Sequence, residues 1–330
     1  MKCWSKRSLI LGWTAIAMAW GLAGPVQAQS PSDYPNKPVT VIVGFTAGGP
    51  TDAVARILAE ELSRQFGQTF LVDNKPGAGA SVAALLTKRA KPDGYTLMFV
   101  SNGALTINPQ IEHLAYDPIR DFTPIGLVAS YPYFLVTSAT SPFYTLDDLL
   151  KKGRDPGSSL NFASAGIGVL NHLAGEWFTH EAQINAKHIP YKGDSATISD
   201  LVAGRVDFAF LAGAAVFPQV KAGKLRILAS ASATPGRGGK DVITLGESRF
   251  KGFVAEPWNG LVGPADLPPE IVAKLNAAIN DIMNRKDVAE RLATMDVYPL
   301  TGTAEQFTDR IKEQTLRWGE IIKMAGIKAE

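Results

Sequence analysis

The chain has 330 residues, with 33 basic and 31 acidic side chains and a formal net charge of +2. Residues 1–28 hold three of the basic residues and none of the acidic ones, so the remaining 302 residues carry 30 basic and 31 acidic side chains. This near-neutral balance excludes the basic surface expected of a protein that binds nucleic acid.

The N-terminus has the pattern of a cleaved secretory signal peptide. Three basic residues within the first seven positions precede an uncharged run from 9 to 23, which is shorter than the roughly 20 residues of a membrane-spanning helix. Pro25 ends the run, and Val26-Gln27-Ala28 places small residues where a signal peptidase reads. We expect cleavage after Ala28 and a soluble mature chain. The only cysteine, Cys3, would leave with this segment, and with it any disulfide or cysteine-based metal site.

The first expected strand and helix follow this segment. Residues 39–45 are rich in β-branched side chains, which is typical of a buried strand. The loop Thr46–Gly49 comes next, and a helix is predicted from Pro50, which suits the first helical position, while Asp52 suits the first turn. The apolar stripe of this helix is formed by Val54, Ile57, Leu58, Leu62 and Phe66.

The order of strand, loop and helix recurs along the chain. Further strands are expected at 69–72, 95–100, 160–163, 206–210 and 225–229, and residues 268–328 are mostly helical. Strands that alternate with helices predict an α/β protein with parallel sheets. The segments 45–49 and 162–166 occupy equivalent places about one small domain apart, which predicts two lobes. We expect one lobe from 29–130 plus 253–330, and a second from 131–252.

Signatures of common catalytic and cofactor sites are absent from the sequence. It contains no G-x-S-x-G, no Walker-type loop and no H-E-x-x-H. Gly77-Ala78-Gly79 and Gly166-Ile167-Gly168 each begin a dinucleotide fingerprint but lack its third glycine. The four histidines, at 113, 172, 180 and 188, have no metal-ligand spacing. We therefore expect no cofactor, no metal and no catalytic residue.

Two glycine loops each lead into the start of a helix. The first backbone N–H groups of a helix lack intrahelical partners and carry partial positive charge, so they bind anions without a cationic side chain. Residues 43–53 carry only Asp52 as a charge, and residues 163–171 carry none. Two such ends across a cleft would suit a small carboxylate ligand. Ordinary βα turns, where glycine only permits a tight bend, explain the same residues equally well.

Several segments resemble, in order, the receptors of tripartite tricarboxylate transporters, also called Bug receptors. The resemblance covers roughly residues 34 to 325. The matching segments are Val43–Asp52, Asp73–Gly79, Lys91–Leu97, Ala165–Gly168 with His172–Ala174, Ile189–Gly193, Asp200–Asp207 and Trp258–Leu261.

This resemblance implies a periplasmic binding protein of the two-lobed, type II-like α/β class, with a ligand cleft between two doubly wound domains. Such a receptor hands a small carboxylate to a membrane permease, and we expect a monomer. The implied ligand residues of the two loops are Phe45, Thr46, Ala47, Gly48, Gly49, Thr51, Asp52, Ser164, Ala165, Gly166 and Gly168. Outside the loops, the implied contacts are Ser101, Asn102, Tyr191, Lys192 and Asp207.

Two departures from the family pattern concern the identity of the ligand and the structure of the loop at 232–249, rather than the fold. Ala47 stands where many relatives have proline, and residues 232–249 lack the family's arginine and Pro-Asp-x-Pro-Thr pattern. Trp258 suits a cleft wall or the core equally well, and a structural role is favoured for His172. Two other functions stay open. One is a secreted enzyme acting on an organic acid through Asp52, His172 or Asp207, and the other is a receptor that presents its closed form to a sensor kinase.

Overall fold

The computed structural model describes residues 33–191, 193–236, 239 and 241–327. The chain divides into two units, Met1–Tyr34 and Pro35–Glu330, and the fold below is that of the second unit. The expected signal peptide, residues 1–28, lies outside the described residues. Within them, no helix has both the length and the apolar character needed to cross a membrane.

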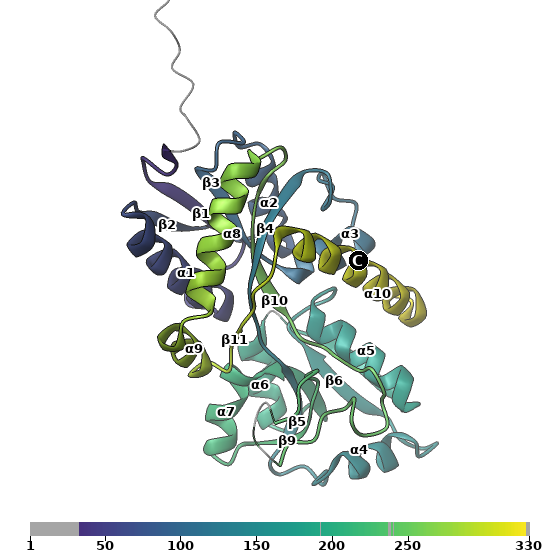
Figure 1. Ribbon diagram of the computed structural model, residues 1–330. Coiled ribbons are helices and arrows are strands. Elements are labelled where there is room, and N and C mark those ends of the chain that lie inside the picture. The colour runs from purple at the N-terminus through teal and green to yellow at the C-terminus, as the bar shows by residue number, and fades with distance from the viewer. Residues whose placement is uncertain (1–32, 192, 237–238, 240, 328–330) are drawn as a thin grey trace, which may run out of the picture. The chain divides into compact units, whose positions relative to one another are not determined.

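The first of two sheets has six strands in the order β11-β4-β10-β3-β1-β2. Its strands are β1 (Val39–Val43), β2 (Phe70–Asn74), β3 (Thr96–Ser101), β4 (Phe122–Ser130), β10 (Trp258–Pro264) and β11 (Tyr298–Pro299). The helices joined to it are α1 (Pro50–Phe66), α2 (Ser81–Lys88), α3 (Asn108–Ile111), α8 (Pro269–Met283), α9 (Lys286–Ala293) and α10 (Ala304–Ala325), with short turns η2 (Ala78–Ala80) and η3 (Gly103–Ile107). Helices α1 and α8 lie side by side (Figure 1).

The second sheet has five strands in the order β7-β6-β8-β5-β9. Its strands are β5 (Tyr133–Ser138), β6 (Leu160–Ser164), β7 (Ala186–Pro190), β8 (Phe208–Ala212) and β9 (Leu225–Ser230). Its helices are α4 (Leu146–Gly153), α5 (Leu170–Ala182), α6 (Asp194–Val202) and α7 (Gly213–Lys221). Apolar side chains bury both faces of this sheet, in one cluster that includes Phe162 and Phe178 and another that includes Phe134 and Leu211.

Local chemistry explains why the predicted strand and helix form near the start of the unit. Strand β1 is fully or largely buried along its length, as its β-branched residues suggest. Helix α1 has Pro50 at its first position and Asp52 in its first turn, and Gly67 ends it in the left-handed conformation at φ 65°. The predicted stripe is buried along Val54, Ile57, Leu58 and Leu62.

The sheets are mixed rather than parallel, which corrects part of the expectation. Strand β1 runs parallel to β2 and β3, and β6 runs parallel to β7 and β8, as the helical crossovers between them require. Strands β4, β5 and β10 run antiparallel to their neighbours and were not predicted. The chain passes from β4 to β5 through only two residues, so it changes sheets there without a helix.

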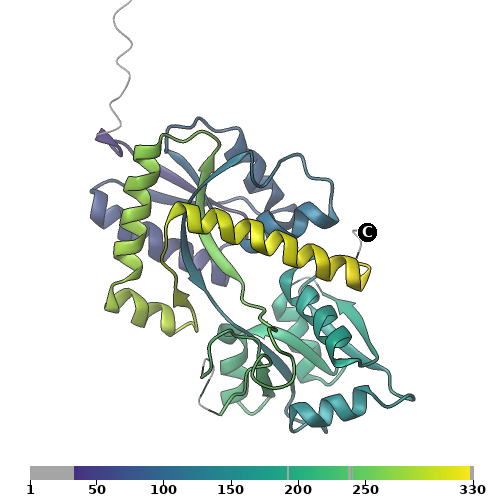
Figure 2. The same ribbon diagram turned by 45° about the vertical axis from the view of Figure 1, so that its right-hand side comes forward.

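Helix α10 packs against both sheets. Its first half places Phe307 and Ile311 in the core of the first sheet, and its second half places Trp318 and Ile322 in the core of the second. The rings of Trp318 and Trp177 of α5 meet edge to face at 6.2 Å between centroids. Figures 1 and 2 both show the end of α10 beside α5. The helix therefore ties the two halves of the unit together.

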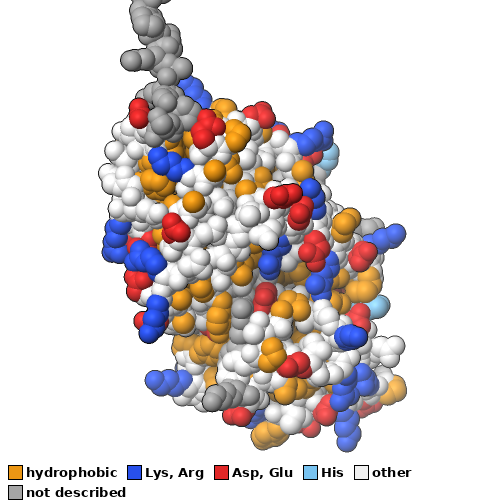
Figure 3. Space-filling view, viewed as in Figure 1, with side chains coloured by type: hydrophobic (Ala, Val, Ile, Leu, Met, Phe, Trp, Pro, Cys, Tyr) orange, Lys and Arg blue, Asp and Glu red, His pale blue; other side chains and the backbone are white. Residues whose placement is uncertain are grey.

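Charged side chains are mixed on the surface. On the face seen in Figure 3, Lys and Arg side chains are interspersed with Asp and Glu. Ion pairs such as Arg291–Glu60, at 2.7 Å, and Arg249–Asp147, at 2.7 Å, connect separate elements. Both pairs are exposed, so each contributes only about 0–1 kcal/mol. The apolar cores, rather than these pairs, account for the stability of the fold.

The buried end of α10 gives the first testable prediction. Trp318→Ala leaves a cavity between α10 and α5, and it should lower the free energy of unfolding by about 3–5 kcal/mol in urea titrations. Leu316→Ala is the matched control, because Leu316 is 72% exposed on the same helix, and its effect should stay within about 0.5 kcal/mol. Equal losses in the two variants would contradict the packing of α10 against the second sheet.

Candidate functional site

In each sheet, the two strands that come next in the chain after one central strand lie on opposite sides of that strand. Strands β2 and β3 lie on opposite sides of β1, and β7 and β8 lie on opposite sides of β6. In open α/β sheets a ligand crevice forms beyond the carboxyl ends of the strands at such a point. The loops 44–49, after β1, and 165–169, after β6, both begin there. The fold thus places both predicted glycine loops where a ligand site is expected.

Asp52 holds the first loop in shape. Its Oδ2 accepts hydrogen bonds from the Gly48 amide and Arg56 Nε, both at 2.9 Å, and its Oδ1 accepts one from Asn74 Nδ2 at 2.8 Å. Burial opposes ionisation of this carboxyl, but the hydrogen bonds from Arg56, Gly48 and Asn74 outweigh burial and lower its pKa. Asp52 is only 2% exposed. We therefore correct its expected role from ligand contact to brace.

The first loop keeps several amides without a partner. Within the described part of the chain, the backbone N–H groups of Thr46, Ala47 and Gly49 donate to no acceptor, and Pro50 has no N–H to offer. Residues 45–48 are exposed. These three donors lie at the positive end of the 17-residue helix α1. The expected amide of Gly48 is not among them, because Asp52 occupies it.

The second loop is braced by residues of its own helix in the same way. The Ala165 amide donates to Asn171 Oδ1 at 3.2 Å, and the Gly168 amide donates to His172 Nδ1 at 3.1 Å. The Gly166 amide donates to Ser164 Oγ at 3.2 Å. Three amides that the sequence assigned to a ligand are therefore engaged by side chains.

Two backbone N–H groups of the second loop remain without an acceptor, one on each side of Gly168. The amides of Ile167 and Val169 donate to no acceptor among the described residues. Ser164 is fully buried and its hydroxyl donates to the Gly166 carbonyl at 2.8 Å, so Ser164 shapes the loop and is not exposed to a ligand. Sequence analysis assigned the ligand contacts to the glycines of this loop. The N–H groups without an acceptor instead belong to Ile167 and Val169, the residues next to Gly168.

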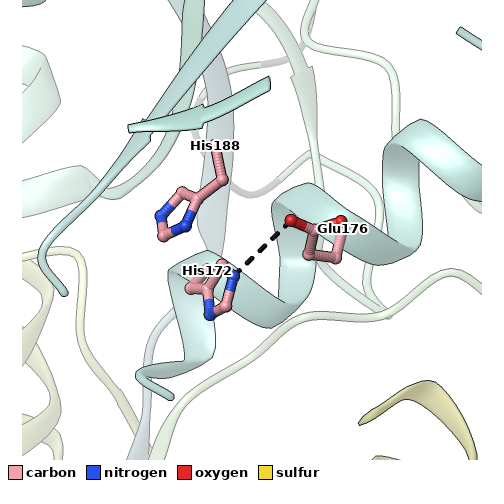
Figure 4. Close-up of side chains that lie close together, drawn as sticks. All are labelled: His172, Glu176 and His188. Atoms are coloured by element: carbon pink, nitrogen blue, oxygen red, sulfur yellow. Dashed lines mark ion pairs between the residues drawn. The ribbon is translucent and has the colours of Figure 1, made fainter. Parts of the chain in front are cut away.

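Two histidines stack behind the second loop (Figure 4). His172 of α5 and His188 of β7 have ring centroids 3.9 Å apart and planes inclined by 19°. His188 Nε2 lies 2.7 Å from Ser164 Oγ, and Glu176 Oε1 lies 3.5 Å from His172 Nε2. Burial, followed by the nearby His172, lowers the pKa of His188 to about 3. His188 is therefore neutral at pH 7.

This histidine pair suits a brace better than a metal centre. His172, Glu176 and His188 offer ligand atoms within 4.8 Å of one another. However, the rings are stacked nearly face to face, so their in-plane lone pairs do not converge on one point. His172 Nδ1 accepts the Gly168 amide, which puts the proton on Nε2 and removes the lone pair that faces Glu176. Metal binding would require this bond to the loop to break.

The side chain of Tyr191 is engaged within its own half of the unit. The Tyr191 hydroxyl donates to Asp200 Oδ2 of α6 at 2.7 Å, and its backbone N–H donates to the carbonyl of Ser164, at the end of β6, at 3.0 Å. Burial and the hydrogen bond to Asp200 raise the pKa of Tyr191 to about 12. Lys192 lies outside the described residues.

Asp207 does not lie near the candidate site, and this prediction was wrong. It precedes β8, and its Oδ2 accepts from the Asn161 amide at 2.7 Å near the amino end of β6. Because Phe208 pairs with Phe162, Asp207 is level with Asn161 rather than with the loop after Ser164. At about 3.3 Å per residue, three positions along a strand separate it from that loop by about 10 Å.

Asn102 retains an unused donor at the end of β3. Its side chain is 3% exposed, and within the described residues its Nδ2 has no hydrogen-bond partner. The preceding residue, Ser101, pairs with Asn259 of β10, whose Oδ1 is also unpartnered among the described residues. Trp258, by contrast, belongs to the core, where its ring packs on Phe307.

Three residues that sequence reasoning missed lie near the loops. Tyr131 is in the link between β4 and β5 and is close to Thr51 of α1, and its pKa is raised by burial and by the charge of Asp194. Asn171 Nδ2 donates to Asp194 Oδ1 at 3.1 Å. No local pattern marks these residues, because the fold alone brings the link, α1 and α6 together.

Two glycines mark close approaches between the halves of the unit. A Cβ atom at Gly168 would lie 2.1 Å from Ile111 Cδ1 of α3, and one at Gly213 would lie 2.0 Å from Asp296 Oδ2. Gly168 also has a φ of 76°, which favours glycine. Only glycine fits where the second loop meets α3.

The histidine stack predicts a pH dependence of stability. The unfolded chain protonates His188 near its usual pKa of 6.5, whereas the folded chain keeps it neutral down to about 3. The free energy of unfolding should therefore fall as the pH is lowered from 7 to 5. In urea titrations this fall should be smaller for His188→Gln and unchanged for the control His180→Gln, since His180 is exposed. An equal fall in all three proteins would contradict the neutral, buried state of His188.

Comparison with known proteins identifies the family. Residues 54–327 match the model of the tripartite tricarboxylate transporter family receptor. A UPF0065 protein from the tcbD–tcbE intergenic region of Pseudomonas sp. (strain P51) is 34% identical over 317 residues, which are 96% of this chain and 94% of that protein.

Solved structures agree with this match. The R. palustris protein Rpa4515 with adipate has a TM-score of 0.82 at 29% identity, over 89% of this chain and 99% of that one. The periplasmic binding protein BugD has a TM-score of 0.76 at 32% identity, over 90% of this chain and 100% of that one. These matches confirm the two-lobed α/β fold of periplasmic binding proteins. The chain belongs to the family of tripartite tricarboxylate transporter receptors, which are solute-binding proteins.

Proposed function

We propose that this chain is an exported periplasmic receptor that captures a small carboxylate through backbone amides of two loops and delivers it to the membrane permease of a tripartite transporter. The observation that carries the proposal is the set of unpartnered amides at Thr46, Ala47, Gly49, Ile167 and Val169. All lie in the loops that lead into α1 and α5, up to the N-cap residues Gly49 and Val169. Adipate in the related Rpa4515 supports a carboxylate as the ligand class.

Elementary electrostatics favours an anion at these amides. An N–H group that loses water without gaining an acceptor costs about 1–3 kcal/mol. A carboxylate supplies up to four acceptor positions, and hydrogen bonds to a charged acceptor are roughly twice as strong as neutral ones. Each helix start adds a partial positive charge of about half a unit.

We propose that the two sheets are the cores of two domains, 29–130 plus 253–330 and 131–252, which close on the ligand. Tyr131 lies at the first crossing between them, close to Thr51 of one domain, and the charge of Asp194 in the other domain raises its pKa. Ligand that contacts both loops would favour the closed arrangement by its differential affinity for that state. Helix α10, which packs on both cores, would limit the range of this motion.

The same geometry supports binding rather than catalysis. Asp52 has its oxygens engaged by Gly48, Arg56 and Asn74. His172 accepts the Gly168 amide, and Asp207 lies at the far end of its strand. General acid–base catalysis needs a group within hydrogen-bond reach of the substrate. The three residues considered for an enzyme are each committed to the fold.

A charge placed in the first loop tests the proposal. Ala47→Asp adds a negative charge beside the free amides, and it should weaken binding of a carboxylate at least tenfold, or about 1.4 kcal/mol. The neutral, similarly sized Ala47→Asn is the control and should stay within about threefold. The measurement is calorimetric titration of residues 29–330, refolded without ligand, with adipate and related acids.

Three outcomes of this titration would count against the proposal. Equal affinities of the aspartate and asparagine variants would place the carboxylate elsewhere. Binding of none of the acids would contradict carboxylate capture. Consumption of the acid during incubation, measured by chromatography, would indicate an enzyme instead of a receptor.

A further inference from the structure

Asp194 is a carboxylate placed beside the second candidate loop. It is the first residue of α6, and its Oδ1 accepts from Asn171 Nδ2 at 3.1 Å. Asn171 Oδ1 in turn accepts the amide of Ala165 at 3.2 Å. One asparagine side chain therefore joins Asp194 to the second loop, on the domain formed around the second sheet.

The charge of Asp194 also acts on the link between the two sheets. Its charge contributes to the raised pKa values of both Tyr131 and Tyr133. Tyr131 is close to Thr51 in the first turn of α1. Asp194 is thus joined to the second loop through one asparagine side chain, and its charge acts on the link between the two sheets.

The carboxylate of Asp194 is incompletely satisfied by the protein. Among the described residues, Oδ2 accepts no hydrogen bond and no Lys, Arg or His forms an ion pair with the group. Oδ2 is not one of the sealed, unpartnered polar atoms of the interior. Burial is the main influence on Asp194 and raises its pKa, since the Asn171 hydrogen bond compensates only in part. By contrast, the buried Asp52 has an arginine and two further donors.

We propose that Asp194 receives an ammonium group of the ligand, so that the receptor selects amino-carboxylates over plain dicarboxylates. This inference rests on the proposed function, in which the free loop amides hold the ligand carboxylate. An ammonium supplies both the positive charge and the hydrogen bond that Oδ2 lacks. A hydroxyl supplies the hydrogen bond alone, and a second carboxylate without either group is repelled by Asp194.

Acids that share a carbon skeleton provide the test. Succinate, malate and aspartate differ only by hydrogen, hydroxyl or ammonium at one carbon, and adipate and 2-aminoadipate form a second pair. Calorimetric titration of refolded residues 29–330 at pH 7.5 should give aspartate and 2-aminoadipate dissociation constants at least tenfold below those of succinate and adipate. Malate should lie between succinate and aspartate.

Two variants test whether Asp194 produces the preference for an ammonium group. Asp194→Asn keeps the shape and removes the charge, and it should reduce the ammonium preference in each series to less than threefold. Asp147→Asn is the matched control, because Asp147 is an exposed carboxylate of α4 in the same half of the unit. It should leave the preference at its wild-type value.

The outcomes separate the inference from the proposed function. If the acids bind but the ammonium members bind no tighter, the inference fails while carboxylate capture stands, and this comparison needs only the wild-type chain. If the preference persists in Asp194→Asn, another residue provides it and the assignment to Asp194 is overturned. If none of the five acids binds, the proposed function fails and the inference fails with it.

Discussion

The site depends on one constraint, which is that every backbone N–H at the start of a helix needs an acceptor from outside the helix. In both loops a side chain from the first turn of the following helix meets part of this need. Asp52 takes the Gly48 amide, while Asn171 and His172 take those of Ala165 and Gly168. The donors left over alternate with the braced ones. Each loop is therefore held in shape by the same residues that decide which of its amides stay without an acceptor.

The rest of the unit positions these two loops. Both follow the central strand of a βαβ pair, at the point where the sheet order reverses, so each opens toward the carboxyl ends of its strands. The His172–His188 stack and Ser164 support the second loop from behind. Helix α10 and the Tyr131 link connect the halves that carry the loops. Rigid braces and a shared connection are what a receptor that closes on its ligand requires.

Sequence reasoning was most successful where local chemistry decides the structure. β-branched residues in 39–43 and Pro50 define the first strand and helix without help from the fold. Strands β4, β5 and β10 escaped prediction because their neighbours in the sheets are distant in sequence. Asp207 was misplaced because its position depends on the register between β6 and β8. Asp194 could not be recognised, since only the fold brings it next to Asn171.

The central claim is that specific amides of the two loops bind the ligand carboxylate. Its most direct test is a two-dimensional ¹H–¹⁵N NMR spectrum of residues 29–330 with and without a saturating acid, either adipate or 2-aminoadipate. New hydrogen bonds to a carboxylate should move the amide protons of Thr46, Ala47, Gly49, Ile167 and Val169 strongly downfield. The already bonded amides of Gly48, Ala165 and Gly168 should move much less. Equal shifts in the two sets, or shifts confined to residues outside these loops, would contradict the claim.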